Sequence, residues 1–357
     1  MSLFRSFRRN RKTVGRDEQI VLYPSFGSRT PDGSSWSLNI QGCVFDPRLP
    51  WFRRSPVMGL IQRAMRIDRS ADEYFRQRMR QFLMSGLKGR SVSVMIGERE
   101  FPVAESDYMG LFKGTVEVPD DFASRLAQSI ENSGRWLGCQ AVLHAPDERE
   151  FAGRLQLIEP TGVSIISDVD DTIKHSNVGN RRDLFRNTFA RRFVPVTGMP
   201  ELYRDCAIAG AVFHFVSGSP WQLYEPLHEF CRTEGYPCGS FHLKRFRFRE
   251  AAKKLRKSPQ KAYKRTAIEP ILLAFPNRRF VLIGDSGEQD PDIYGSLLRE
   301  FPDQIIGVFI RAIRGESRDA ERIRNAFEGA DTAKWSLYVD PDEIRADVAR
   351  LVAIGHS

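Results

Sequence analysis

The sequence predicts an α/β protein in two parts, a parallel sheet with helices on both faces preceded by a β-rich, sandwich-like domain. Two patterns lead to this prediction. Up to about Pro160, apolar and polar residues alternate with a period of two, as in strands that bury one face. Beyond it, short uninterrupted apolar runs alternate with segments of helical length, which indicates strands buried on both faces.

We expect three segments along the 357 residues: a basic tail over 1–16, the β-rich domain with a helical insertion over 17–160, and the α/β domain over 161–357. The tail has no apolar core of the kind that secretory signals carry. The five cysteines are scattered, without metal-ligand pairs or a disulfide framework. These features favour a reducing, cytoplasmic compartment.

In the β-rich domain, four segments are expected to form strands: Trp36–Phe45, Ser91–Phe101, Leu111–Val118 and Leu137–His144. The residues Ser55–Leu87 interrupt them with an arginine-rich amphipathic helix or helical hairpin. We expect this helix to pack on the sandwich rather than to lie on a membrane.

In the α/β domain, four apolar runs are expected to form the strands: "GVSIIS", "GAVFHFVS", "RRFVLIG" and "QIIGVFI". Each of the first three ends in a polar cluster, namely "DVDDT", "SGSP" and "GDSGEQD". In open α/β sheets, functional groups gather beyond the carboxyl ends of the strands. The sequence therefore predicts a site at this edge of the sheet.

The acidic residues of these clusters predict a metal ion. Asp168 and Asp170 point to the same side of an extended chain, and with Asp285 and Asp290 they place more negative charge in a buried site than it can hold without a cation. Oxygen ligands without His or Cys suit Mg²⁺. Asp171 or Thr172 could instead only cap the following turn.

The second cluster, "SGSPWQLY", predicts a phosphate cradle. Ser219 is a favourable N-cap and Pro220 a favourable first helical residue, so a helix is expected to begin after Gly218. The free N–H groups of such a helix attract an anion. The hydroxyl of Ser217, at the strand end, could bond a phosphoryl oxygen.

Four motifs carry a family resemblance, over roughly Ser164 to Ile313: "SDVDDTIKHSNV", "VSGSPWQLY", "YKRTAIEPIL" and "FPNRRFVLIGDSGEQDPDIY". Together they resemble the haloacid-dehalogenase-type phosphatases. They are more closely similar to the fungal actin-patch phosphatidate phosphatase catalytic-domain family and its bacterial relatives. The resemblance implies a haloacid-dehalogenase-like fold and hydrolysis of a phosphomonoester.

The resemblance also implies a role for each residue. Asp168 would attack phosphorus to give an aspartyl-phosphate, and Asp170 would act as acid and then as base. Mg²⁺ would sit on Asp168, Asp285 and the backbone carbonyl of Asp170, with Asp290 supporting the metal or its waters. Ser217 and a lysine would complete the catalytic set. The substrate would be contacted by Thr172, Gly218 and Ser219.

The identity of that lysine depends on where a helix begins. "TAIE" at Thr266–Glu269 has capping-box spacing, which would place Lys264 just before a helix. If Ser258-Pro259 begins the helix instead, Lys261 and Lys264 share one face, although Pro270 disfavours an uninterrupted helix. We prefer Lys264, because its 21-residue distance from Asp285 is similar to that in the superfamily.

The basic residues bear on the substrate. The net charge is +9, and Lys244–Arg265 alone holds eleven Lys or Arg against one acid, Glu250. Such a stretch is usually a solvated face, but it could also attract an anionic membrane. The leading prediction is a phosphatase that converts phosphatidate to diacylglycerol, cytoplasmic with peripheral membrane contact as an option.

Two alternatives remain. One is a phosphatase for a soluble phosphoester or a phosphoprotein. The other is a nucleic-acid-binding protein that uses Lys244–Arg265, which we do not favour because only Phe246 and Phe248 interleave with its early arginines. The sequence makes no prediction of oligomeric state.

Overall fold

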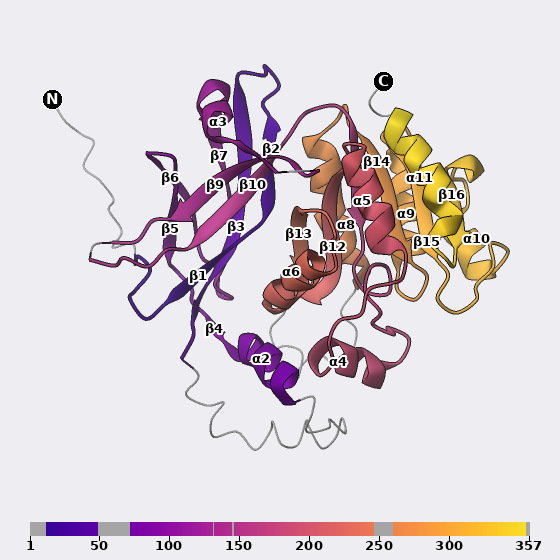
Figure 1. Cartoon of the computed structure of the whole chain (residues 1–357), viewed down its shortest axis with the longest axis horizontal. Helices are drawn as coiled ribbons and strands as arrows, with labels where there is room; N and C mark the ends of the chain where they lie inside the picture. The colour runs from indigo at the N-terminus through magenta and orange to yellow at the C-terminus, as the bar shows by residue number, and fades with distance from the viewer. Residues whose placement is uncertain (1–11, 49–71, 131, 145, 246–259, 355–357) are drawn as a thin grey trace. The chain divides into compact units, whose positions relative to one another are not determined.

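The computed structural model describes residues 12–48, 72–130, 132–144, 146–245 and 260–354. The chain separates into two compact units (Figure 1). The first takes its described residues from 1–53, 84–128 and 136–157, and the second from 54–83, 129–135 and 158–357.

The first unit contains most of the ten strands of a single hydrogen-bonded sheet. These strands are β1 (Gln19–Tyr23), β2 (Ser25–Arg29), β3 (Ser35–Asp46), β4 (Ser85–Gly86), β5 (Ser91–Ile96), β6 (Arg99–Glu105), β7 (Leu111–Pro119), β8 (Gln128–Ile130), β9 (Gly134–Ala141) and β10 (Ala152–Ile158). The long β3 pairs antiparallel with β1, β2, β4 and β7. A short helix, α3 (Asp120–Leu126), follows β7. The sandwich-like packing stays a prediction.

One of the four strands predicted for this unit was wrong. The segment Ser91–Phe101 is a hairpin of β5 and β6, in which Ile96 pairs with Arg99. Gly97 lies between them with a φ of 56°, which a glycine adopts at low cost and which allows a two-residue turn. The other three segments fall largely within β3, β7 and β9.

The second unit is built on a six-stranded parallel sheet, as predicted. Its strands are β11 (Val163–Ser167), β12 (Val212–Pro220), β13 (Gly239–Lys244), β14 (Arg279–Asp285), β15 (Ile305–Arg311) and β16 (Trp335–Tyr338), in the order β13-β12-β11-β14-β15-β16. The chain moves outward from β11 in one direction and returns to β14 on its other side. The point between β11 and β14 is therefore the topological switch point, where open α/β sheets bind their ligands.

Helices cover both faces of this sheet. The helices that follow β11 in this unit are α4 (Arg181–Phe189), α5 (Met199–Ile208), α6 (Tyr224–Thr233), α8 (Gln260–Ala274), α9 (Asp290–Glu300), α10 (Glu321–Phe327) and α11 (Asp342–Ile354), with short 3₁₀ turns η3 (Trp221–Leu223) and η4 (Thr332–Lys334). Right-handed crossovers place α5 and α6 on one face and α8, α9 and α10 on the other. α11 packs beside α5 (Figure 1).

The helix expected over Ser55–Leu87 is described only as α2 (Asp72–Leu83), since residues 49–71 lie outside the described part. Its predicted packing was wrong. α2 belongs to the second unit, where it contacts α4 and η3. The physical reason is its inward face, on which Phe75, Arg78 and Met79 are buried. Arg78 donates hydrogen bonds to the carbonyls of Thr188 and Arg191, at and beyond the end of α4.

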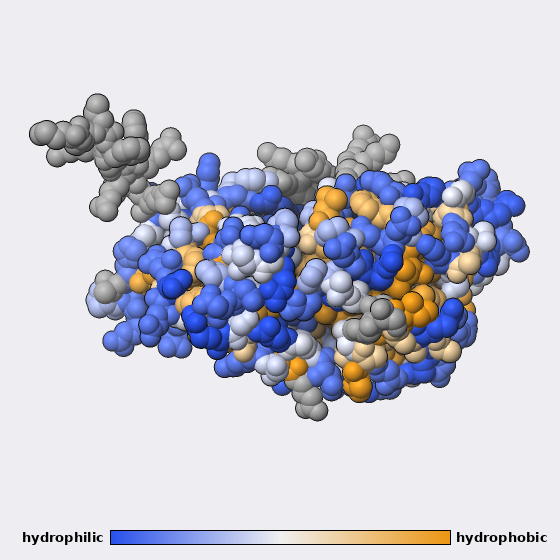
Figure 2. All heavy atoms as spheres, turned by 90° about the horizontal axis from the view of Figure 1, so that it is seen from above, coloured by the Kyte–Doolittle hydropathy of each residue, from blue (hydrophilic) through white to orange (hydrophobic). Residues whose placement is uncertain are grey.

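One face of the molecule is mainly polar. Figure 2 shows hydrophilic residues over most of one face, with smaller apolar areas between them. Within the described residues, no helix combines the length and the apolar character that crossing a membrane requires.

A buried arginine anchors the start of the parallel sheet. Arg278 donates from Nε to the Ser164 hydroxyl, and its two Nη atoms donate to the carbonyls of Glu159, Thr161 and Val163. We predict that Arg278→Met lowers the free energy of unfolding by roughly 2–4 kcal/mol, because buried acceptors lose a charged donor. Urea titration followed by circular dichroism measures this change.

The neighbouring Arg279→Met is the matched control, because this side chain is exposed and bonds one surface carbonyl. We expect a loss below roughly 0.5 kcal/mol for it. Equal losses in the two variants would contradict the anchoring role.

Candidate active site

Two strand ends meet at the switch point. β11 ends at Ser167, and the backbone N–H of the next residue, Asp168, donates to the carbonyl of Ile283 at 2.9 Å. This bond continues the ladder between β11 and β14 and brings Asp168 beside Asp285, the last residue of β14. Both side chains are buried.

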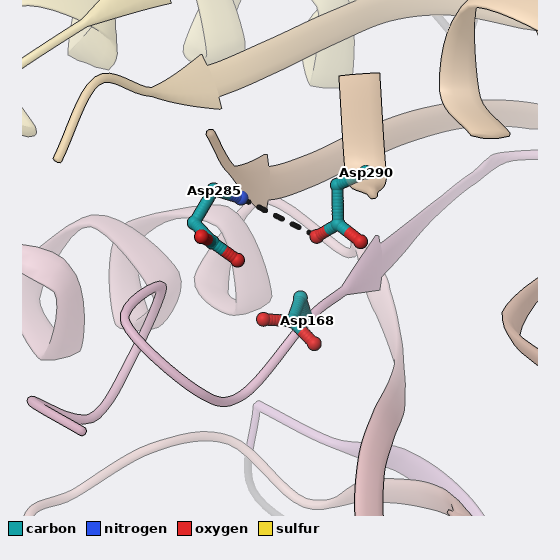
Figure 3. Close-up of side chains that lie close together, drawn as sticks. All are labelled: Asp168, Asp285 and Asp290. Atoms are coloured by element: carbon teal, nitrogen blue, oxygen red, sulfur yellow. Dashed lines mark hydrogen bonds between the residues drawn. The ribbon is translucent and has the colours of Figure 1, made fainter. Parts of the chain in front are cut away.

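A third aspartate, Asp290, joins them from the start of α9 (Figure 3). Each of Asp168, Asp285 and Asp290 offers a carboxylate oxygen, and these oxygens lie within 4.8 Å of one another. The backbone N–H of Asp285 donates to Oδ2 of Asp290 at 3.3 Å. Gly284 makes room for this contact, since a Cβ there would lie 2.4 Å from that oxygen.

One lysine faces this cluster. Nζ of Lys264, from α8, lies 2.8 Å from Oδ1 of Asp168 and 3.2 Å from Oε2 of Glu288, and it donates to Asp290. Burial alone would lower the pKa of Lys264, but the surrounding carboxylates raise it well above its ordinary value. The ammonium group is therefore charged.

The pKa values of two neighbouring carboxyl groups are raised as well, which favours their neutral forms. Burial raises the pKa of Asp168 well above its ordinary value, against the attraction of Lys264, and the other carboxylates add to the increase. Burial and Asp290 likewise raise the pKa of Asp285. Four carboxyl groups, those of Asp168, Asp285, Glu288 and Asp290, thus surround one ammonium group.

These residues fit a bound divalent cation. Oδ2 of Asp285 is buried and accepts no hydrogen bond from the described residues. Oδ1 of Asp168 also accepts no hydrogen bond from the described residues. Its contact with Nζ of Lys264 at 2.8 Å is an ion pair. Buried oxygen donors with negative charge in excess are what Mg²⁺ requires.

The side chain of Asp170 lies in a different network. It accepts from Nζ of Lys174 at 2.7 Å and from the hydroxyls of Ser176, Ser219 and Ser217 at 2.6, 2.8 and 3.1 Å. Burial would raise the pKa of Asp170, but the lysine and the hydroxyls lower it well below its ordinary value. The structure therefore separates this carboxylate from the other three, and a metal contact through its backbone carbonyl stays a prediction.

The helix expected to begin after Gly218 was predicted wrongly. β12 continues to Pro220 with an irregular register after Ser217, η3 follows, and α6 begins at Tyr224. Ser219 does not cap a helix because its hydroxyl donates to Asp170 and its N–H donates to Oγ of Ser217 at 2.9 Å. The polar groups of this cluster are thus two hydroxyls and loop backbone rather than a helix N-terminus.

The residues after Asp170 shape the loop. Asp171 has a φ of 55°, and its carboxylate accepts from the backbone N–H groups of Ser176, Asn177 and Val178 at 2.7–2.8 Å. This is the structural role left open for it by the sequence. Thr172 instead turns inward, and its hydroxyl donates to Oδ2 of Asp168 at 3.3 Å.

The second of the two helix starts considered for the lysine agrees better with the structure. α8 runs from Gln260 to Ala274 and contains Pro270, so Thr266 lies inside the helix and does not begin it. The Thr266 hydroxyl donates to the carbonyl of Tyr263. Lys264 reaches the carboxylates, whereas the side chain of Lys261 lies outside the described part.

Three residues of the site are not among the site residues assigned from the sequence. Glu288 lies within "GDSGEQD", so its place in that cluster was a usable signal. Lys174 is fully buried beside Asp170, and Ser176 bonds both. No pattern in the sequence marks Ser176, because its contact depends on how the loop folds back.

Comparison with known proteins finds similarity in the part of the chain that contains the candidate active site. Residues 163–312 match the family model described as "Phosphatidate phosphatase APP1, catalytic domain", which confirms the predicted similarity to the actin-patch phosphatidate phosphatase catalytic-domain family. The phosphatidate phosphatase APP1 of Saccharomyces cerevisiae is 34% identical over 166 residues, 45% of this chain and 28% of that protein. An uncharacterized Schizosaccharomyces pombe protein is 29% identical over 69% of this chain and 42% of its own length. The chain thus spans less than half of either relative.

The buried carboxylates lead to a prediction about stability. Because the folded protein raises the pKa of Asp285, its ionisation at neutral pH opposes folding when no cation is bound. We predict that Asp285→Asn raises the free energy of unfolding in chelator at neutral pH by roughly 1–3 kcal/mol. The difference should shrink as the pH falls toward the ordinary carboxyl pKa, because the wild-type group then binds its proton in both states.

Urea titrations with EDTA and with excess Mg²⁺ measure both effects. Mg²⁺ should stabilise the wild-type protein and should stabilise the variant much less. The exposed Asp319→Asn serves as control and should change neither value. Equal responses to Mg²⁺ in wild type and Asp285→Asn would contradict the metal site.

Proposed function

We propose that this chain is a Mg²⁺-dependent phosphatase of haloacid-dehalogenase-like fold that hydrolyses a phosphomonoester, phosphatidate being the proposed substrate and diacylglycerol the product. One observation carries the proposal. A buried aspartate at the end of β11, Asp168, lies at the switch point beside a lysine and two further aspartates. A carboxylate so placed can act as a nucleophile toward a phosphoryl group.

The metal would be held by Asp168 and Asp285, with Asp290 and the backbone carbonyl of Asp170 in support. When bound, Mg²⁺ would screen the charge between an anionic nucleophile and an anionic substrate. Lys264 supplies fixed positive charge at the same place, because its ammonium lies 2.8 Å from Asp168. Ser217, Thr172, Gly218 and Ser219 remain the proposed phosphate contacts.

The reaction proceeds in two steps. An oxygen of Asp168 forms a bond to phosphorus while the bond to the leaving alkoxide breaks, and Asp170 protonates that alkoxide. In the second step Asp170 takes a proton from water while the water oxygen bonds to phosphorus. The bond between phosphorus and Asp168 breaks, which releases inorganic phosphate and restores the Asp168 carboxylate. The ionised form of Asp170 that Lys174 stabilises suits the second step, and the negative charge of a bound phosphoryl group favours its protonation for the first.

The substrate rests on similarity. The Saccharomyces cerevisiae relative is a phosphatidate phosphatase, and this chain covers 28% of its length. The basic stretch proposed to contact an anionic membrane, Lys244–Arg265, lies mostly outside the described residues, since 246–259 are not described. A soluble phosphoester or a phosphoprotein is the second candidate, and a cytoplasmic location with peripheral membrane contact stays a proposal. Nucleic-acid binding is the alternative that we do not favour.

The role of Asp168 as the nucleophile can be tested by substitution. Asp168→Asn should lower turnover of any substrate roughly 10³-fold or more, because the near-isosteric amide cannot attack phosphorus as an anion. Phosphate release measures the activity, and urea titration verifies that the variant folds. Turnover near the wild-type rate in a folded Asp168→Asn protein would exclude the mechanism.

The second prediction tests the substrate. We compare phosphate release from three substrates at equal concentration. They are phosphatidate in mixed micelles, soluble glycerol 3-phosphate and a soluble phosphopeptide. We expect kcat/KM for phosphatidate to exceed the others at least about tenfold, which corresponds to roughly 1.4 kcal/mol. A preference for glycerol 3-phosphate or the phosphopeptide would favour the alternative, a phosphatase for a soluble phosphoester or a phosphoprotein.

A further inference from the structure

A cavity of about 540 Å³ lies within the second unit, between α2 and α6. Its volume falls in the range of small-molecule sites. Its walls combine aromatic rings, among them Tyr74, Phe193, Tyr224 and Phe230, with the guanidinium of Arg78. Neither Asp168 nor any other carboxylate of the candidate active site lines it.

Arg78 is the unusual member of this wall. Its side chain is only 4% exposed, and its guanidinium stacks 3.8 Å from the ring centre of Phe193. Nη1 donates to the carbonyls of Thr188 and Arg191 at 2.7 and 2.8 Å. Among the described residues, Nε and Nη2 have no acceptor, and no carboxylate pairs with the charge.

A second buried arginine shows that the fold can satisfy such a group. Arg278 is 3% exposed and donates from Nε and from both Nη atoms. Burial lowers the pKa of Arg78 to about 10, so its guanidinium stays charged at neutral pH. The two unused donors of Arg78 are not among the fully buried unsatisfied atoms, so they reach solvent where Arg78 lines the cavity. An anion in the cavity can therefore accept hydrogen bonds from this charged group.

The acidic residues on the wall are already engaged. Glu234 pairs with Arg192 at 3.0 Å. Glu225 accepts from the amide of Gln81, and burial raises its pKa, which disfavours its negative charge.

The exposed Glu229 pairs with Arg232 at 2.7 Å. These pairings leave Arg78 as the charge on the wall without a counter-ion among the described residues.

We propose that this cavity binds a phosphate-type oxyanion through Nε and Nη2 of Arg78, at a second site apart from Asp168. These two donors lie in one plane, in the fork arrangement that matches two oxygens of a phosphate. The anion is either free phosphate or the phosphate of a lipid headgroup. The cavity adjoins the Asp170 network, because Nζ of Lys174 lies 4.8 Å from the centre of the same Phe193 ring.

The test measures binding without turnover, so it stands apart from the proposed function. The full chain, in chelator, is titrated with inorganic phosphate by isothermal calorimetry. In a second arm it is mixed with phosphatidylcholine vesicles with and without phosphatidate, and binding is measured by co-sedimentation. Arg78→Met should weaken binding of the recognised probe roughly tenfold or more. The exposed Arg191→Met, whose side chain does not line the cavity, should leave it within about twofold.

A second variant tests the proposal independently, in case Arg78→Met does not fold. Gln77 is exposed on α2 and lines the cavity, so Gln77→Glu should fold and repel the anion. Loss of inorganic phosphate binding in both variants identifies a free anion, and loss of vesicle binding alone identifies a lipid headgroup. If neither probe binds the wild-type chain, or if both variants bind as the wild type does, the proposal is overturned.

Discussion

The second unit depends on one electrostatic constraint, the crowding of four carboxyl groups around the ammonium group of Lys264. The carboxyl groups come from the end of β11, the end of β14, the loop after it and the start of α9, and the lysine comes from α8. Each of these elements must end or begin at the switch point for the charges to meet. The local shortage of positive charge is what makes the site suitable for a divalent cation.

Asp168 and Asp170 are two residues apart and have opposite surroundings. Burial and neighbouring carboxylates raise the pKa of Asp168, whereas Lys174 and three hydroxyls overcome burial and lower the pKa of Asp170. Two carboxyl groups whose environments differ in this way can take different roles in one reaction. The loop that follows Asp170 is held by Asp171, whose carboxylate accepts hydrogen bonds from three backbone N–H groups.

Part of the second unit comes from outside the segment that matches the phosphatase family. The match covers residues 163–312, whereas α2 spans Asp72–Leu83. Through Arg78, this helix contributes a buried charge to a cavity whose other wall is α6. Any ligand of that cavity would therefore depend on residues that the family comparison does not cover.

The sequence by itself determined the parallel sheet, the strand ends that carry polar clusters and the family resemblance. These follow from local patterns. A strand buried on both faces must be apolar throughout, so the polar residues of this unit's motifs are placed directly after the strand ends. The tertiary structure alone decided that Asp170 pairs with Lys174, that Glu288 joins Lys264, that Ser219 bonds Asp170 instead of capping a helix, and that α2 packs in the second unit. Each of these depends on contacts between residues distant in sequence or on the path of a loop, and neither periodicity nor capping preference contains that information.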